Sequence, residues 1–293
     1  MVDPLAQALG DPALPAPARA TLRLLREELD ADPQAALLSL FFDGDEPRAS
    51  IAFGEVGSAD LVVVLLHGVD TDLSALPGWA AIARRLCADV IRASARRGGS
   101  DRVATVAWFG YDSGSHLTAL ATGHATIGAA RLAGDLVRIR HGNPTARLSL
   151  VAYSYSSTLL GELILIDGAG PVSQAFSIAS AGMTRMAADA VAEAIAERRL
   201  AFFATEASSD TTAPLGRLGA HPVDPRDIDG AVVFGADGGT VPGTRGVRGE
   251  ATEGHASRTA VDEDGEVHRG YFATDGQAYL FVVDQLSRRA SRR

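Results

Sequence analysis

Residues 148–161, LSLVAYSYSSTLLG, decide how the rest of this chain is interpreted. The apolar run 148–151 is typical of a buried strand, and the residues after the turn have the pattern of a helix. Ser154 stands between them, at the tip of a tight strand-to-helix turn. Ala152 and Ser156 flank it two positions away on either side, and both are small enough for the close backbone contacts of such a bend. A strained turn that carries a hydroxyl group persists mainly where function requires it.

The same turn has a second interpretation. Small hydroxyl residues are common in loops between strands and helices, where a side-chain oxygen accepts a hydrogen bond from the first turn of the helix. On this interpretation Ser154 is a helix cap and carries no chemistry. The rest of the chain has to decide between the two.

Composition sets limits on the class of protein. The chain has 293 residues, of which 46% are hydrophobic, so it can bury a sizeable core in one large or two small domains. Its net charge of −9 argues against nucleic acid as the main partner. All 27 basic residues are arginine. The absence of lysine excludes phosphate binding by a P-loop lysine and Schiff-base chemistry.

The single cysteine, Cys87, excludes an internal disulfide framework, a cysteine zinc site and a redox pair. We expect it to pack on a helix, and we predict neither a metal nor a cofactor. The first residues lack the basic and apolar regions of an export signal, and no apolar run approaches the length of a membrane helix. The sequence therefore predicts a cytoplasmic protein that does not bind a membrane.

Strands and helices alternate along most of the chain, which is typical of a mostly parallel sheet with helices on both faces. Residues 1–60 are predicted to hold a loose lead-in (1–20), a helix and a β-hairpin joined to that sheet. Residues 61–293 form the core, with a long loop at 235–274 before the final helix. The predicted elements are helix 21–29, hairpin strands 35–42 and 49–53, strand 61–66, helix 76–93, strand 102–108, helix 127–139, strand 148–151, the helix after the turn, strand 174–179, helix 186–198, strands 200–205 and 231–234, and helix 277–286.

A second candidate feature follows the buried strand 61–66, where His67 and Gly68 come directly after six apolar residues. The glycine lets the backbone turn so that N–H groups point into a site at the strand end. We expect His67 to be structural. Rigid backbone donors suit a developing oxyanion, and we predict that the N–H groups of Val69 and Tyr155 provide them.

A serine at such a turn needs an acid and a histidine later in the chain, in the order Ser, Asp or Glu, His. The strand ending at residue 205 runs into a loop with Glu206 and Asp210, and we choose Asp210 because Glu206 lies so close to the strand. Two histidines follow, His255 and His268. We choose His268 because it directly precedes an aromatic segment and the final helix.

The strand 102–108 ends in aromatic and acidic residues at the edge where open α/β sheets bind ligands. Tyr111 and Asp112 are therefore candidate substrate contacts. The alternative is a turn closed by an Asx-type hydrogen bond from the aspartate.

These residues together give the sequence a resemblance to a largely uncharacterised bacterial branch of the α/β-hydrolase superfamily, over about residues 61–286. The motifs that carry the resemblance are WFGYD (108–112), SYSST (154–158), PVDP (222–225) and HRGYF (268–272). The family has Gly-His before the serine and Tyr-Gly after it, where this chain has Ala152-Tyr153 and Tyr155-Ser156. The resemblance implies an α/β-hydrolase fold with Ser154 as nucleophile, Asp210 as acid and His268 as base.

The predicted function is a cofactor-independent serine hydrolase that cleaves an ester, thioester or related acyl bond of a small molecule through an acyl-enzyme on Ser154. Two alternatives remain open at this point: an acyltransferase or cyclase with the same triad, and a non-catalytic binding protein on a hydrolase scaffold. The sequence fixes neither the substrate nor the oligomeric state.

Overall fold

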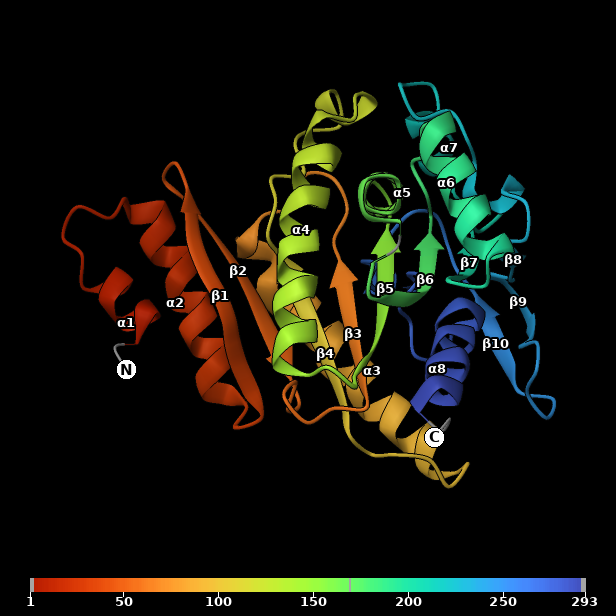
Figure 1. Cartoon of the computed structure of the whole chain (residues 1–293), viewed down its shortest axis with the longest axis horizontal. Helices are drawn as coiled ribbons and strands as arrows, with labels where there is room; N and C mark the ends of the chain where they lie inside the picture. Colours follow the sequence, from red (N-terminus) through yellow and green to blue (C-terminus); the bar gives the residue numbers. More distant parts are fainter. Residues whose placement is uncertain (1–2, 169, 291–293) are drawn as a thin grey trace.

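The computed structural model describes residues 3–168 and 170–290, and a twisted sheet runs through the middle of this part (Figure 1). Within these residues the sheet has eight strands in the order β1-β2-β4-β3-β5-β6-β7-β8. β1 and β2 form an antiparallel hairpin, β2 pairs antiparallel with β4, and every later pair is parallel. The strands are β1 (Ala35–Asp43), β2 (Glu46–Phe53), β3 (Leu61–Leu66), β4 (Val103–Phe109), β5 (Arg147–Tyr153), β6 (Val172–Ile178), β7 (Ala201–Thr205) and β8 (Val232–Val233).

Helices cover both faces of the sheet, as the alternating pattern predicted. The longer helices are α2 (Ala16–Ala31), α3 (Leu76–Ala95), α4 (Gly123–Gly142), α5 (Ser156–Asp167), α6 (Arg185–Ala196) and α8 (Gln277–Ala290). α3 and α8 pack on one face, and α4, α5 and α6 pack side by side on the other. β3, β4 and β5 lie between these layers and are apolar on both faces because each face has a helix to bury it.

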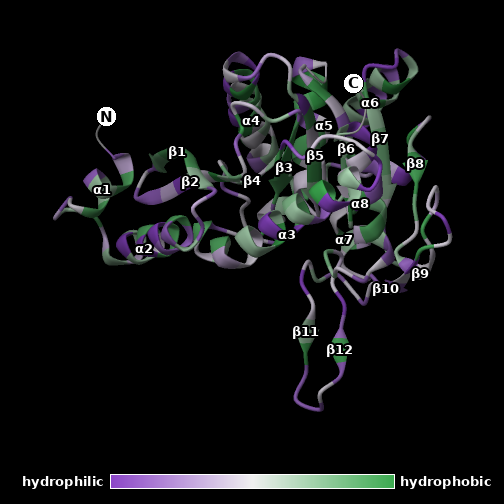
Figure 2. Ribbon diagram, turned by 90° about the horizontal axis from the view of Figure 1, so that it is seen from below, coloured by the Kyte–Doolittle hydropathy of each residue, from purple (hydrophilic) through white to green (hydrophobic). Residues whose placement is uncertain are grey.

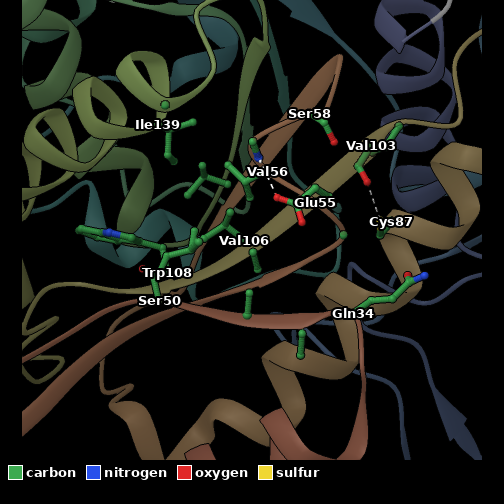
Figure 3. Close-up of a pocket in the computed structure, with 18 of the residues that line it drawn as sticks. Gln34, Ser50, Glu55, Val56, Ser58, Cys87, Val103, Val106, Trp108 and Ile139 are labelled. Carbon is green, nitrogen blue, oxygen red and sulfur yellow. Dashed lines mark hydrogen bonds between the residues drawn. The ribbon is translucent and has the colours of Figure 1, made fainter. Parts of the chain in front are cut away.

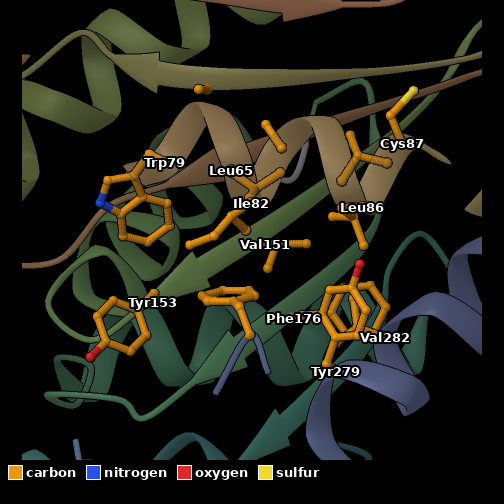
Figure 4. Close-up of a cluster of buried hydrophobic side chains, with 14 of the residues drawn as sticks. Leu65, Trp79, Ile82, Leu86, Cys87, Val151, Tyr153, Phe176, Tyr279 and Val282 are labelled. Atoms are coloured by element: carbon orange, nitrogen blue, oxygen red, sulfur yellow. The ribbon is translucent and has the colours of Figure 1, made fainter. Parts of the chain in front are cut away.

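Two apolar clusters result, one on each side of the sheet. Figure 4 shows part of the cluster between α3, the sheet and α8, with Tyr153 at one end and Tyr279 at the other. Cys87 belongs to this cluster on α3, as expected, and burial raises the pKa of its thiol to about 11. At neutral pH it is therefore a protonated packing residue.

The N-terminal part differs from the prediction at its beginning. The residues expected to be a loose lead-in contain α1 (Pro4–Leu9) and the first turn of α2. Asp3 makes α1 possible because its carboxylate accepts hydrogen bonds from the amides of Leu5 and Ala6. The predicted β-hairpin is confirmed as β1 and β2.

The segment predicted as a long loop, 235–274, is also more ordered than expected. It contains two small antiparallel sheets, β9 (Asp237–Thr240) with β10 (Arg248–Ala251), and β11 (Ala260–Val261) with β12 (Val267–His268). Figure 2 shows the β11–β12 ribbon projecting away from the body of the molecule. No described helix is both long enough and apolar enough to cross a lipid bilayer.

The remaining elements are short turns of helix at the edge of the sheet where the parallel strands end. They are η1 (Leu73–Ala75), η2 (Thr118–Leu120), α7 (Ala213–Gly216) and η3 (Pro225–Asp227). η2 and the chain after α7 contact each other, because the amide of Ala220 donates to the carbonyl of Leu120.

Candidate active site

The turn after β5 has the strained geometry that the sequence suggested. β5 ends at Tyr153 and α5 begins at Ser156, and Ser154 between them has a φ of 57°. A side-chain-bearing residue in this left-handed region is uncommon, and such strain concentrates at functional sites. The bend directs the Ser154 side chain away from the axis of β5. The residue is nearly buried, with 4% of its surface exposed.

Ser156 explains how the turn does without its second glycine. Its Oγ accepts a hydrogen bond from the amide of Tyr153 at 2.8 Å. The same oxygen lies 3.0 Å from the carbonyl oxygen of Leu66 and 2.9 Å from that of Tyr153, so its proton has an acceptor in either direction. The side chain that replaces glycine is thus fully hydrogen-bonded inside the turn.

Ser154, His255 and Asp210 form a hydrogen-bonded chain. Ser154 Oγ lies 2.9 Å from His255 Nε2, and His255 Nδ1 lies 2.8 Å from Asp210 Oδ2. An ionised carboxylate can only accept, so the hydrogen of the neutral imidazole is on Nδ1 and Nε2 is free to accept from the serine. This geometry contradicts the helix-cap interpretation, since the Ser154 hydroxyl bonds to a histidine rather than to the first turn of α5.

Asp210 is placed as the sequence analysis chose. Its Oδ1 accepts from the amides of Thr212 and Ala213, both at 3.0 Å, and its Oδ2 accepts from His255 and from the Tyr271 hydroxyl at 2.9 Å. Burial alone raises the pKa of this carboxyl, but the hydrogen bonds, that of His255 above all, outweigh burial and lower the pKa below its usual value. Asp210 is therefore ionised at neutral pH.

His268, predicted as the base, lies elsewhere, and that prediction needs correcting. It belongs to β12 in the projecting ribbon, its side chain is 50% exposed, and its two ring nitrogens lie 3.0 Å from carboxylate oxygens of Glu253 and Asp262. These carboxylates raise the pKa of His268, Asp262 having the larger effect. The segment that carries His255 is bound to the loop after β7, because Ser209 Oγ donates to the carbonyl of Thr252 and accepts from the amide of Gly254, each at 3.0 Å.

Glu206, the alternative acid, has a different set of partners. Its carboxylate pairs with Arg217 at 2.6 Å and with Arg226 at 2.9 Å. Asp224, from the PVDP motif, pairs with Arg226 at 2.6 Å. These ion pairs bind the chain between α7 and β8 to the end of β7. The carboxylate of Glu206 therefore has a structural role and does not pair with His255.

The loop after β3 borders Ser154. A Cβ built on Gly68 would lie only 3.0 Å from the Ser154 Cβ, so a larger residue here would displace the serine. Among the described residues, no hydrogen bond uses the backbone N–H of Val69 or of Tyr155. Neither N–H therefore has an intramolecular acceptor in the part of the chain that the structure describes.

His67 is structural, as expected. Its ring stacks between Phe109 and Tyr111, with both centroids 4.8 Å away, and its Nδ1 lies 3.0 Å from the carbonyl oxygen of Gly68. Burial lowers the pKa of His67 to about 4, so the ring is neutral at physiological pH.

Tyr111 and Asp112 do not support the prediction that they contact substrate. Tyr111 is completely buried, and its hydroxyl donates to the carbonyl of His67 at 3.0 Å. Asp112 accepts from the amide of Gly114 at 2.9 Å, which is the Asx-type turn considered as the alternative. Both residues support the loops around the site.

A cavity of about 750 Å³ lies away from these residues, between the β1–β2 hairpin and α4 (Figure 3). Trp108, Val106 and Ile139 provide apolar walls, while Gln34 and Glu55 come from the ends of the hairpin. Ser154, Asp210 and His255 do not line it. The site argued from Ser154 and this cavity are therefore separate features of the molecule.

The fold and this arrangement of side chains define a class, the α/β hydrolases, and comparison with known proteins agrees. The model of a family described as alpha/beta hydrolase matches residues 43–220, more than half of the chain. The chain belongs to this alpha/beta hydrolase family.

Two mycobacterial relatives are similar to most of the chain. An uncharacterized protein of Mycobacterium tuberculosis and one of Mycobacterium bovis are each 29% identical over 237 residues, covering 76% of this chain and 85% of theirs. Among solved structures, an alpha-beta serine hydrolase homologue from Coxiella burnetii is 13% identical with a TM-score of 0.42, covering 67% of this chain and 85% of that one. A predicted CIB-like hydrolase from Thermoplasma acidophilum is 13% identical with a TM-score of 0.46, covering 87% and 99%.

Proposed function

We propose that this protein is a serine hydrolase that cleaves an ester, thioester or related acyl bond of a small molecule through an acyl-enzyme on Ser154. The observation that carries the proposal is the unbroken chain of hydrogen bonds Ser154–His255–Asp210 at 2.9 and 2.8 Å. Ser154 and Asp210 lie in the loops that follow β5 and β7, His255 comes from the irregular segment after β10, and the serine is in a strained conformation. Three such residues rarely meet in this order without a catalytic role.

In the proposed reaction, Ser154 Oγ attacks the acyl carbonyl carbon while His255 Nε2 takes the hydroxyl proton. Asp210, ionised at neutral pH, keeps the imidazole hydrogen on Nδ1 and stabilises the imidazolium that forms. The tetrahedral oxyanion binds the backbone N–H groups of Val69 and Tyr155.

The intermediate then collapses, and His255 Nε2 passes its proton to the departing alcohol or thiol. Water attacks the acyl-enzyme with His255 again as base, which releases the acid and restores the serine. Every proton in this cycle passes through Nε2. The cycle needs no metal or organic cofactor.

The proposal is tested by reaction with a fluorophosphonate, which phosphonylates an activated serine. We expect a single adduct, mapped by peptide mass spectrometry to Ser154, that is absent from Ser154→Ala. The matched control is Ser58→Ala, which removes an exposed serine before β3 and leaves labelling unchanged. A folded wild-type protein that forms no adduct contradicts the proposal.

A panel of p-nitrophenyl esters and acyl thioesters of increasing chain length then measures which acyl group is preferred. Turnover must disappear in Ser154→Ala. Turnover that survives this substitution in a pure preparation assigns the activity to another site and removes the role given to Ser154.

A further inference from the structure

We propose that Tyr153 and Tyr271 are positioning residues that hold the His255–Asp210 pair from its two ends; the inference rests on the proposed function. Tyr271 Oη donates to Asp210 Oδ2 at 2.9 Å, the same oxygen that accepts from His255 Nδ1. Tyr153 Oη donates to the main-chain carbonyl of His255. Both residues are buried, and neither was chosen as functional from the sequence.

His255 needs such support because its own segment has little structure. The chain from 252 to 259 forms no helix or strand, and Glu253 and Ala256 on either side of the histidine are exposed. The side chain of His255 is 20% exposed. An imidazole on such a segment keeps its place only through contacts made from outside the segment.

Tyr271 provides one of these contacts through both its main chain and its side chain. Its amide donates to the carbonyl of Ala256 at 3.0 Å, next to the histidine. Its hydroxyl accepts from the amide of Ala207 at 2.8 Å, which leaves the hydroxyl hydrogen directed at Asp210. Burial and the neighbouring Asp210 raise the pKa of Tyr271, so the phenol stays protonated and donates at any working pH.

Tyr153 provides the other contact from the residue directly before the nucleophile. Its ring centroid lies 5.4 Å from that of His255, 6.2 Å from that of Tyr271 and 6.0 Å from that of Phe272. The turn that carries Ser154 therefore also fixes the backbone of the base.

The two contacts have different consequences for proton transfer. The Tyr271 hydroxyl withdraws charge from the carboxylate that stabilises the imidazolium. Removing it leaves Asp210 more negative toward His255, so the neutral imidazole that catalysis requires forms at higher pH. The Tyr153 contact is to a main-chain carbonyl, so its removal loosens the imidazole without this electrostatic effect.

The experiment measures the second-order rate of fluorophosphonate labelling of Ser154 against pH. For Tyr271→Phe we expect about a tenfold lower rate, the loss of one hydrogen bond to a charged group, and an acid limb displaced to higher pH. For Tyr153→Phe we expect about a threefold lower rate with the acid limb in its original place. Both variants keep the ring and its packing.

Tyr279→Phe is the matched control. Tyr279 is also buried and donates to a carboxylate, Asp89 Oδ2 at 2.7 Å, but it lies on α8 at the far end of the apolar cluster (Figure 4). It should cost stability and leave both the labelling rate and its pH profile unchanged. If Tyr271→Phe behaves in the same way, with lower stability and an unchanged pH profile, the inference is wrong.

Two further measurements cover a variant that does not fold and a failure of the proposed function. Site-specific 3-fluorotyrosine at position 271 keeps the fold and is a stronger donor, so it should displace the acid limb to lower pH; no displacement overturns the inference. NMR titration of the His255 imidazole needs no turnover. If wild type is not labelled at Ser154, the proposed function fails, while the titration midpoint still shows whether Tyr271 acts on the pair.

Discussion

The two histidines of the 235–274 segment show how similar local chemistry leads to different roles. His255 bonds a buried carboxylate through Nδ1 and a serine hydroxyl through Nε2. His268 bonds carboxylates through both nitrogens, at the surface. Two carboxylate acceptors require hydrogens on both nitrogens of His268, which favours the imidazolium, and an imidazolium cannot accept a proton. A base needs one nitrogen left as an acceptor, and His255 alone of the two has it.

The most direct test of this difference between His255 and His268 is to remove each imidazole in turn. His255→Ala deletes the base of the proposed reaction, and we expect the labelling rate and any ester turnover to fall at least about a thousandfold. His268→Ala should leave the labelling rate and the ester turnover within about twofold of wild type. The reason is that, among the described residues, no hydrogen bond joins the ribbon to Ser154. Both rates are measured on protein whose circular dichroism matches wild type.

The opposite result has a clear meaning. If His268→Ala is inactive and His255→Ala retains the labelling rate, the ribbon must fold over Ser154 in solution. His268 would then be the base, as the sequence analysis predicts. If both variants lose the labelling rate, the order of the ribbon must also determine the position of the His255 segment.

A second comparison concerns the carboxylates. Asp210→Asn removes the charge that stabilises the imidazolium and allows the wrong tautomer, so we expect about a hundredfold loss or more in kcat/KM. Asp262→Asn makes the same chemical change beside His268 and should have no effect on kcat/KM. Equal losses in the two variants would contradict the separation of the two sites.

Most of the fold could be predicted from the sequence, because the strands at 61–66, 103–109 and 147–153 are apolar on both faces and alternate with helices. The strained serine, Asp210 and the loop after His67 were predictable for the same reason. Each lies in the loop that follows a strand of the main sheet, and the carboxyl ends of parallel strands meet at one edge of the sheet.

His255 could not be placed in this way, because it follows no strand of the main sheet. Its position depends on contacts distant in sequence: the amide of Gly254 donates to Ser209 Oγ, and Tyr153 and Tyr271 hold the histidine itself. Chain order alone admits both histidines. The signal that separates them is Asp264-Gly265 between Val261 and Val267, a hairpin signature that places His268 on a ribbon opposite Ala260.

The sequence alone did not separate the two interpretations of Tyr111 for a related reason. From the sequence, an aromatic residue at a strand end is equally compatible with a substrate contact and with a buried packing position. The structure decides through the hydrogen bond from its hydroxyl to the His67 carbonyl. The Asx-type turn of Asp112 depends on local sequence alone and was foreseen as the alternative.

The smallest expected effect concerns the ribbon itself. The carboxylates of Asp262 and Glu253 raise the pKa of His268 above its usual value near 6.5, so these ion pairs stabilise the ribbon fully below that value. The stabilisation is lost as the pH rises through the raised pKa of the folded state.

His268→Gln should therefore lower hydrogen-exchange protection of β11 and β12 at pH 5.5 by at most a few fold, since exposed ion pairs contribute little. At pH 9 variant and wild type should be equally protected, with exchange at His255 unchanged throughout. A difference that grows with pH instead would contradict the ion pairs as its cause.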